Sequence, residues 1–474
     1  MRFDSLTFIV FLAITIGLYA LLQQWRHRKL WLILASYIFY AAWNPPFVLL
    51  LWFSTLVDFR LAKLIHKSTT DQKRKAWLIL SLISNLGLLA FFKYGNFLLE
   101  NFIFLSKSFG LTFKPAEFSI ILPIGISFYT FQTLSYTIDV YRKKLEPTDK
   151  LTDFALFVTF FPQLVAGPIV RAVDFLPQLI SPKKLDKQAM GWGAILVTIG
   201  LFYKQVFADA LFSPVSDQIF NADGAYNALS AWAGVLAFTG QIFCDFAGYS
   251  IIAIGLARMF GFTLPDNFNA PYAAEGFSDF WRRWHITLSS WLRDYLYISL
   301  GGNRGGRLFT ARNLVITMLL GGLWHGAAWT FVIWGGLHGF YLILERQLRN
   351  IFPLFFASKR GLNKIIIRLV TLLLVIIAWI PFRATDFPSA WSIFTSLFHI
   401  NSAHNQILTS REILSIFLGI SFIIGSQWIY RDQKSFSETI SRVPYGILSV
   451  ALAAMIWLIV TLPAPDKGFI YFQF

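Results

Sequence analysis

The sequence predicts an all-α, polytopic transmembrane protein, with about 11–12 spans and with short re-entrant and interfacial helices around a central tunnel. Of its 474 residues, 56% are hydrophobic and only 14% are charged. A soluble domain of this composition would expose much of that apolar surface to water, so lipid is the favoured solvent. The apolar residues also form runs that approach the roughly 20 residues needed to cross the hydrocarbon core, among them 6–22, 365–380, 413–429 and 447–462.

The first apolar run is expected to be a retained span and not a cleaved signal peptide. No small-residue cleavage pattern follows residues 6–22, and the basic cluster at 26–29 comes after the run. The formal net charge of +16 could indicate nucleic-acid binding, but basic loops of membrane proteins are retained on the cytoplasmic side. Basic clusters occur as late as residues 431–442. If these clusters are cytoplasmic, both termini are extracytoplasmic. Loop charge then accounts for the net charge, and nucleic acid is not expected to be a partner.

Proline-containing interruptions predict where regular spans end. The Trp-Asn-Pro-Pro turn at 43–46 indicates the external tip of a hairpin. Phe-Pro at 161–162 and Gly-Pro at 167–168 interrupt an apolar stretch, and such backbone persists at membrane depth only where protein or a water-filled cavity shields it. We expect a membrane-embedded domain over 1–440, with its core motifs at about 115–345, and a final span with an extracytoplasmic tail over 441–474.

Three of the seven histidines lie in surroundings that suit chemistry: His285, His325 and His338. His325 falls inside the apolar run 314–334, near mid-bilayer, where ionisable residues are costly and often functional. Its neutral imidazole could accept a proton; the alternative is a packed histidine satisfied by a neighbouring helix. On one straight helix His338 would lie about 20 Å away, so we expect it to pack and not to share the site, unless the helix breaks at 335–336.

The segment 281–295 predicts an interfacial amphipathic helix that carries His285 on its apolar face. Its arginines either anchor the helix to anionic lipid or face the phosphates of a bound acyl donor. The glycine-rich basic loop at 301–306 could extend such a phosphate site, although it lacks a P-loop ending. The candidate donor-binding residues are Arg282, Arg283, Arg293, Asn303 and Arg304.

No metal site is predicted, because the sequence contains no metal-ligand spacing. The single cysteine, Cys244, excludes an internal disulfide and a cysteine-based cluster. A lone cysteine in an apolar run is typical of a core residue, although a thioester intermediate on Cys244 is an alternative.

At these motifs the sequence resembles the membrane-bound O-acyltransferases, specifically the bacterial type that O-acetylates alginate or peptidoglycan and D-alanylates teichoic acid. The likeness rests on 122–128, 161–171, 279–303 and 319–329. It implies a bacterial cytoplasmic (inner) membrane protein with a membrane funnel, acetyl-CoA as a cytoplasmic donor substrate and no permanently bound cofactor. It also implies that His325, in Trp-His-Gly, is catalytic and that His285 is the second characteristic histidine.

The C-terminal tail, 469–474, looks like the motif that ends a small companion protein of the teichoic-acid D-alanylation machinery, where a tyrosine takes the acyl group. The likeness implies that Tyr471 accepts acetyl and passes it to an extracytoplasmic acetyltransferase partner that modifies a cell-surface polysaccharide. The alternative is that Tyr471 is an interfacial aromatic residue. Rival functions are D-alanyl transfer, an inactive scaffold, and a transporter or flippase in which His325, His285 and Asp245 relay protons.

Overall fold

The computed structural model describes the chain except residues 112, 114–119, 223–225, 358–360, 400–406, 434–435, 463–467 and 471–474. It divides into two compact units, residues 1–193 with 256–264, and residues 194–255 with 265–474. Within the described residues every regular element is helical. The prediction of an all-α polytopic membrane protein is therefore confirmed.

The first unit begins with a hairpin of α1 and α2, and a proline-containing turn follows the end of α2. Helix α2 ends at Ala41, and the predicted turn holds a short 3₁₀ helix before α3 begins. The elements of this unit are α1 (Leu6–Leu21), α2 (Trp25–Ala41), η1 (Pro45–Phe47), α3 (Val48–Lys67), α4 (Asp71–Leu89), η2 (Ala90–Tyr94), α5 (Gly95–Ser108), α6 (Ile126–Tyr141), α7 (Leu151–Thr159), α8 (Phe161–Leu164), α9 (Ala172–Phe175), η3 (Leu176–Leu179) and the start of α10 (Lys187–Leu201). The short helices α8 and α9 lie where the prolines interrupt the apolar sequence.

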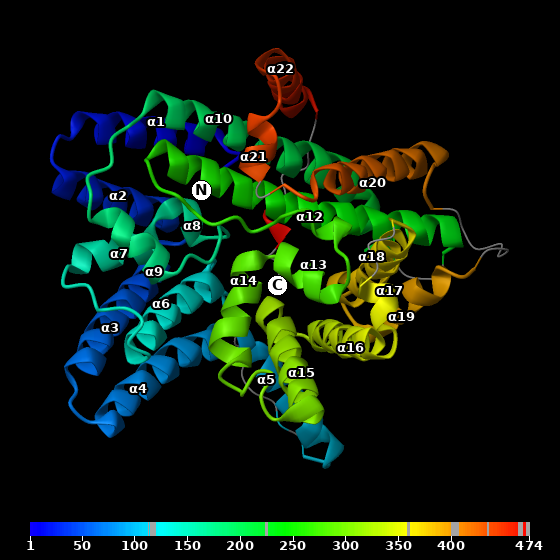
Figure 1. Ribbon diagram of the computed structural model, residues 1–474, viewed down its shortest axis with the longest axis horizontal. Helices are drawn as coiled ribbons and strands as arrows, with labels where there is room; N and C mark the ends of the chain where they lie inside the picture. Colours follow the sequence, from blue (N-terminus) through cyan, green and yellow to red (C-terminus); the bar gives the residue numbers. More distant parts are fainter. Residues whose placement is uncertain are drawn as a thin grey trace. The chain divides into compact units, whose positions relative to one another are not determined.

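A buried polar cluster joins α3, α4 and α6, which pack side by side (Figure 1). The carboxylate of Asp58 accepts a hydrogen bond from Ser81 Oγ at 2.6 Å and from Asn85 Nδ2 at 2.8 Å. Helix α6 joins the cluster because Thr133 Oγ1 donates to Asn85 Oδ1 at 3.1 Å. Hydrogen bonding of this kind is required for polar groups held away from water.

The second unit contains both histidine motifs. Its elements, after the end of α10, are η4 (Phe202–Phe212), α11 (Ser213–Phe220), α12 (Ala228–Met259, whose last turn belongs to the first unit), η5 (Pro271–Ala273), α13 (Phe277–Arg283), α14 (Ile286–Trp291), η6 (Leu292–Tyr297), α15 (Gly306–His325), α16 (Trp329–Ile351), α17 (Pro353–Ala357), α18 (Gly361–Arg383), α19 (Phe387–Ser396), α20 (Ser410–Tyr430), α21 (Phe436–Ser441) and α22 (Tyr445–Thr461).

Helices α15 and α16 form a tightly packed hairpin (Figure 1). Glycines at the contact remove the side chains that would hold the backbones apart. A Cβ on Gly322 would lie 2.2 Å from the carbonyl oxygen of Phe331, and one on Gly335 would lie 2.3 Å from that of Met318. The glycines therefore bring the end of α15 against the start of α16.

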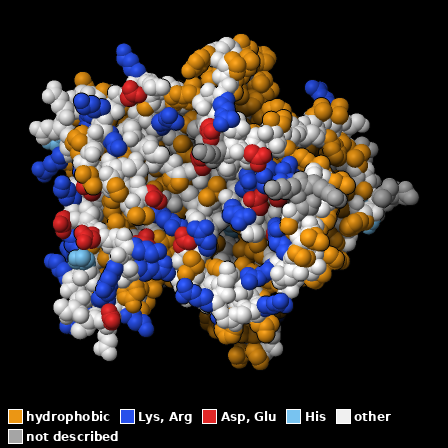
Figure 2. Space-filling view, viewed as in Figure 1, with side chains coloured by type: hydrophobic (Ala, Val, Ile, Leu, Met, Phe, Trp, Pro, Cys, Tyr) orange, Lys and Arg blue, Asp and Glu red, His pale blue; other side chains and the backbone are white. Residues whose placement is uncertain are grey.

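Several helices are apolar enough to lie in lipid. Five helical segments of the described chain are long and apolar enough to cross a membrane: Asp71–Ser108, Lys187–Phe220, Ala228–Met259, Gly361–Arg383 and Ser410–Tyr430. Helices α1 and α22 are also apolar but shorter. On α22 the side chains of Val450 and Val460 are 72% and 77% exposed, and Figure 2 shows apolar atoms over this helix. Such a surface suits contact with lipid and not with water.

Candidate active site

His325 is the last residue of α15. Gly326 follows with an extended backbone, and a Cβ at this position would lie 2.0 Å from the ring of Phe331. Helix α16 then begins at Trp329. The chain therefore does not continue as one straight helix from His325 to His338, because Gly326 is extended and the Phe331 ring fills the space beside it.

Aromatic rings enclose the imidazole of His325. Its centroid lies 5.1 Å from that of Trp324, 5.0 Å from that of Trp334 and 5.4 Å from that of Phe382. The His325 side chain is buried. The rings thus separate the imidazole from bulk solvent.

His285 lies at a sharp break between α13 and α14. The prediction of one continuous amphipathic helix over 281–295 is wrong, because α13 ends at Arg283 and His285 has φ +41° and ψ +55°. A non-glycine residue in this left-handed conformation costs roughly 1–3 kcal/mol and persists only where its surroundings fix it. Asn267 provides that support: its carbonyl oxygen accepts from the N–H of Ile286 at 2.9 Å, and its Oδ1 accepts from Thr287 Oγ1 at 2.9 Å.

The break turns His285 inward toward His325. The two imidazole centroids lie 6.2 Å apart, and the His285 ring lies 5.8 Å from Trp324 and 4.5 Å from Phe246. His285 is buried, so it does not lie on a lipid-facing or water-facing surface. The structure therefore brings together the two histidines that the motifs single out.

His338 packs against Trp334 and Trp281. Its ring lies 4.8 Å from Trp334, which also contacts His325, and 5.0 Å from Trp281. Helix α16 runs unbroken through residues 335–336, and the 20 Å separation expected for one straight helix does not apply because the chain reverses at Gly326. Trp334 thus contacts both imidazoles, and His338 packs within the same aromatic cluster.

The five predicted donor-binding residues do not form one cluster. Arg282 is exposed, with 67% of its side chain accessible, whereas the Arg283 Nε donates to Asp279 Oδ2 at 3.0 Å. Arg293 pairs with its neighbour Asp294 at 2.7 Å. In the loop, Asn303 Oδ1 accepts from Tyr297 Oη at 2.6 Å and from Arg346 at 3.2 Å, and Arg304 is exposed. Arg282, Arg293, Asn303 and Arg304 are therefore exposed, whereas the Arg283 side chain is largely covered.

Arg283 belongs to an ion-pair network around Asp279. Arg431 also contacts Asp279 Oδ2, at 2.9 Å, and Arg368 contacts Glu275 at 2.7 Å. Burial would raise the pKa of Asp279, but the hydrogen bond from the Glu275 N–H and the guanidinium groups of Arg283 and Arg431 outweigh it and hold that pKa below its usual range. The network ties α13 to α18 and to the end of α20.

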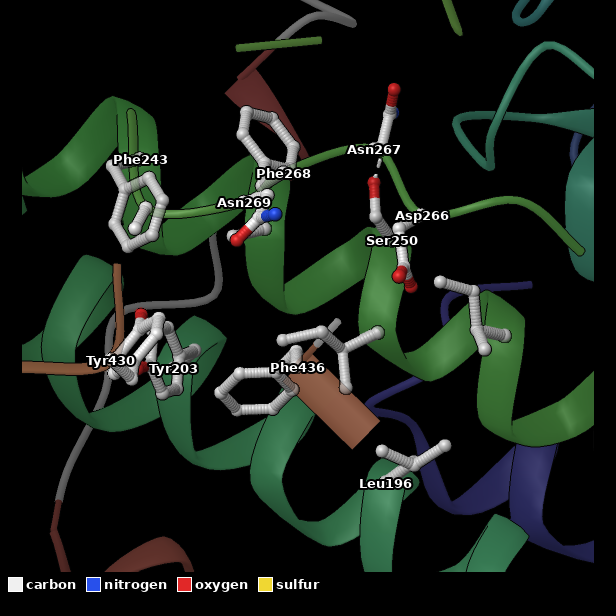
Figure 3. Close-up of a pocket in the computed structure, with 14 residues that line it drawn as sticks. Leu196, Tyr203, Phe243, Ser250, Asp266, Asn267, Phe268, Asn269, Tyr430 and Phe436 are labelled. Atoms are coloured by element: carbon white, nitrogen blue, oxygen red, sulfur yellow. Dashed lines mark hydrogen bonds between the residues drawn. The ribbon is translucent and has the colours of Figure 1, made fainter. Parts of the chain in front are cut away.

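A pocket lies beside the His285 turn, between α12, the segment 266–270, and aromatic residues of η4, α20 and α21 (Figure 3). About 570 Å³ of space lies between these residues, part of it open to solvent. Its lining combines aromatic side chains, such as Phe243, Phe268 and Phe436, with the polar residues Ser250 and Asn267. Asn267 Nδ2 donates to Ser250 Oγ at 3.2 Å. Asn267 therefore contributes to the pocket wall and also supports the backbone of His285.

The described part of the C-terminal tail, residues 468–470, packs beside Phe246, which contacts His285. Phe469 and Ile470 are buried, and the Ile470 N–H donates to Asp245 Oδ2 at 2.7 Å. The Phe469 ring lies 5.4 Å from Phe246, whose ring also contacts His285. Tyr471, the predicted acyl acceptor, lies outside the described residues.

Comparison with known families decides the class of protein. Residues 64–383, which include both histidines, match the family described as "MBOAT, membrane-bound O-acyltransferase family". The chain belongs to the membrane-bound O-acyltransferase family. The predicted resemblance is confirmed, and the protein is a membrane acyltransferase.

Named relatives of this acyltransferase modify polymers. The chain is 40% identical over 454 residues to a probable alginate O-acetylase AlgI of Azotobacter vinelandii, covering 94% of this chain and 87% of that one. It is 39% identical over 399 residues to a peptidoglycan O-acetyltransferase of Helicobacter pylori, covering 79% and 74%. A teichoic acid D-alanyltransferase of Streptococcus thermophilus is 30% identical over 235 residues, covering 47% and 56%. The likeness to the acetyltransferases thus extends over much more of the chain.

Sequence reasoning missed several residues that hold this part of the structure together. The sequence around Asn267 does not indicate its role, because that role depends on the backbone turn at His285. Lys204 does have a local signal: it lies in an apolar segment, and ionisable residues in such segments are functional candidates for the same reason as His325. Arg431 lies in the basic cluster 431–442, and its position there does not indicate its contact with Asp279.

Proposed function

We propose that the protein is an O-acetyltransferase that passes acetyl from cytoplasmic acetyl-CoA across a bacterial cytoplasmic membrane toward a cell-surface polysaccharide. Peptidoglycan or an alginate-like exopolysaccharide is the final acceptor. The names of the relatives similar over most of the chain support O-acetylation, and the shorter match to a D-alanyltransferase makes D-alanyl transfer the weaker alternative.

The 6.2 Å approach of the His285 and His325 rings carries this proposal. His325 removes the proton of an acceptor hydroxyl as its oxygen attacks the thioester carbonyl. The new C–O bond forms, the C–S bond breaks, and the coenzyme A thiolate takes the proton from His325. His285 orients a reactant or polarises the carbonyl. Proton transfer by a positioned histidine contributes typically 10²–10⁴-fold to rate.

The donor binds with its phosphates toward the basic segment. Guanidinium groups suit phosphate oxygens, and the exposure of Arg282 and Arg304 makes these two available for direct contact. Arg283 supports the segment through Asp279. Coenzyme A itself stays on the cytoplasmic side, and no cofactor is held between turnovers.

Tyr471 receives the acetyl group and passes it to an extracytoplasmic acetyltransferase partner. The rule that basic loops stay in the cytoplasm supports extracytoplasmic termini. The contact of Phe469 with Phe246, whose ring also contacts His285, supports this relay. Tyr471→Phe keeps the ring and removes the hydroxyl, so acetyl should no longer appear on the tail in intact-protein mass spectrometry. Unchanged transfer by this variant would exclude the relay.

Labelled acetyl-CoA and the purified full-length protein in lipid nanodiscs test the function. The wild type should release coenzyme A and transfer the acetyl label, and His325→Ala should lose this by about 10²-fold or more. His338→Phe is the matched control, because it changes a histidine of the same aromatic cluster that is expected only to pack; it should retain transfer. Equal losses in both variants, or label accepted only from a D-alanyl donor, would contradict the assignment.

A further inference from the structure

We propose that Lys204, Asp209 and Asp245 form a docking site for the C-terminal tail of the same chain, in which Asp245 is a positioning residue for acetyl transfer. The ligand of this site is a peptide segment with a main-chain N–H donor and an aromatic side chain. The docking step is independent of the proposed function, whereas the positioning role rests on it.

The docking site is a buried cluster of charge. Lys204 Nζ lies 2.6 Å from Asp245 Oδ1 and 2.9 Å from Asp209 Oδ1, and all three side chains are buried. Buried ions are strongly destabilising unless they are paired and hydrogen-bonded. Two carboxylates around one ammonium favour a further hydrogen-bond donor, and the Ile470 N–H supplies one to Asp245 Oδ2 at 2.7 Å.

The two oxygens of Asp245 thus have different roles. Oδ1 contacts Lys204 inside the site, whereas Oδ2 contacts the tail. A main-chain donor would bind in any register, so the side chains must select one. The Phe469 ring does so by packing 4.8 Å from Tyr249 and 5.4 Å from Phe246.

The docking site is connected to the histidine pair by one residue. Asp245, which binds the tail backbone, is followed on α12 by Phe246, whose ring lies 4.5 Å from His285. Ile470 is the residue before Tyr471 in the sequence, and Tyr471 is the acetyl acceptor of the proposed function. Asp245 therefore acts through the tail and does not itself touch the reacting atoms.

Two substitutions at one position isolate the hydrogen bond. Ile470→Pro removes the N–H, whereas Ile470→Ala keeps it, and both shorten the side chain. Trypsin can cut after Lys467 and release the peptide 468–474, which mass spectrometry quantifies. In full-length protein in nanodiscs, release should be about tenfold faster for Ile470→Pro than for Ile470→Ala, as expected for losing a hydrogen bond to a charged acceptor. Equal release rates would overturn the docking site.

Variants of two carboxylates, one inside and one outside the docking site, provide the second test. Asp245→Ala should release the tail like Ile470→Pro, and Asp432→Asn, which changes an exposed carboxylate outside the docking site, should protect it like the wild type. In the same samples Ile470→Pro should lower kcat for acetylation of the tail while the KM for acetyl-CoA stays unchanged, which general unfolding would not produce. Fast release with unchanged kcat would overturn the positioning role. A wild type that protects its tail but transfers no acetyl would instead refute the proposed function and leave docking intact.

Discussion

The imidazole centroids of His285 and His325 lie 6.2 Å apart although the two residues come from different helices. One histidine stands at a left-handed break before α14 and the other at the last position of α15. Both placements depend on residues that carry no chemistry, Asn267 at the break and Gly326 at the helix end. The site is therefore built by backbone interruptions and not by the face of a regular helix.

Close packing of the α15–α16 hairpin predicts a large effect for a single methyl group. Gly322→Ala would place a Cβ 2.2 Å from a backbone oxygen that cannot rotate away. We expect a loss of about 1–3 kcal/mol in stability, as for other overpacked cores, together with reduced transfer. Gly17→Ala, also inside a helix but with nothing within 4 Å of its Cβ, should leave the melting temperature unchanged or raise it. Equal melting temperatures for the two variants would argue against this packing.

The conformation of His285 predicts which replacements fold. Asparagine tolerates the left-handed region, whereas a β-branched residue does not. His285→Asn should therefore unfold at a higher temperature than His285→Val, although both lack the imidazole and should transfer acetyl poorly. Thermal unfolding in detergent, followed by circular dichroism, compares them. If the valine variant were the more stable, φ +41° at this position would be wrong.

The arginines should separate into two classes. Arg282→Gln and Arg304→Gln change exposed side chains, so they should raise the KM for acetyl-CoA with little change in kcat or stability. Arg283→Gln removes a partner of Asp279 and should lower the melting temperature instead. Steady-state kinetics with acetyl-CoA and with a donor that lacks the nucleotide phosphates measure the difference. A KM effect that persists with the truncated donor would exclude phosphate contact.

The Asp279 network predicts a pH-dependent contribution to stability. Because the folded state holds the pKa of Asp279 below its usual value, the stabilisation is fully present above the unfolded pKa, about 3.9, and is lost as the pH falls through the folded pKa. The difference in melting temperature between wild type and Asp279→Asn should therefore be constant above about pH 5 and shrink below about pH 4. A difference that grew on acidification would have the wrong sign.

The spans and their main interruptions could be predicted because hydropathy and proline act locally. The helices at 6–21 and 410–430 match the apolar runs, and the turn before α3 matches Pro45-Pro46. The break at His285 could not be predicted, because its left-handed backbone depends on Asn267, a distant residue in the sequence. The end of α15 at His325 was missed because an apolar run looks the same whether its helix continues or reverses.

The sequence indicated which residues belong to the candidate site better than it indicated how they are arranged. Motif resemblance selected His285 and His325, but the Lys204–Asp245 pair and its contact with Ile470 join segments that no local pattern connects. Arg283 illustrates the same limit. Its sequence position suggests phosphate binding, whereas its acidic partner Asp279 is recognised only once the helix is folded.

The acetyl content of cell-surface glycans shows whether this acyltransferase delivers acetyl to a polysaccharide through His325. Mass spectrometry should detect ester-linked acetyl on polysaccharide isolated from cells that make the wild-type protein, and its loss from cells that make an equal amount of folded His325→Ala. His338→Phe should restore the wild-type content. Identical acetylation in cells with wild-type and His325→Ala protein would contradict the account.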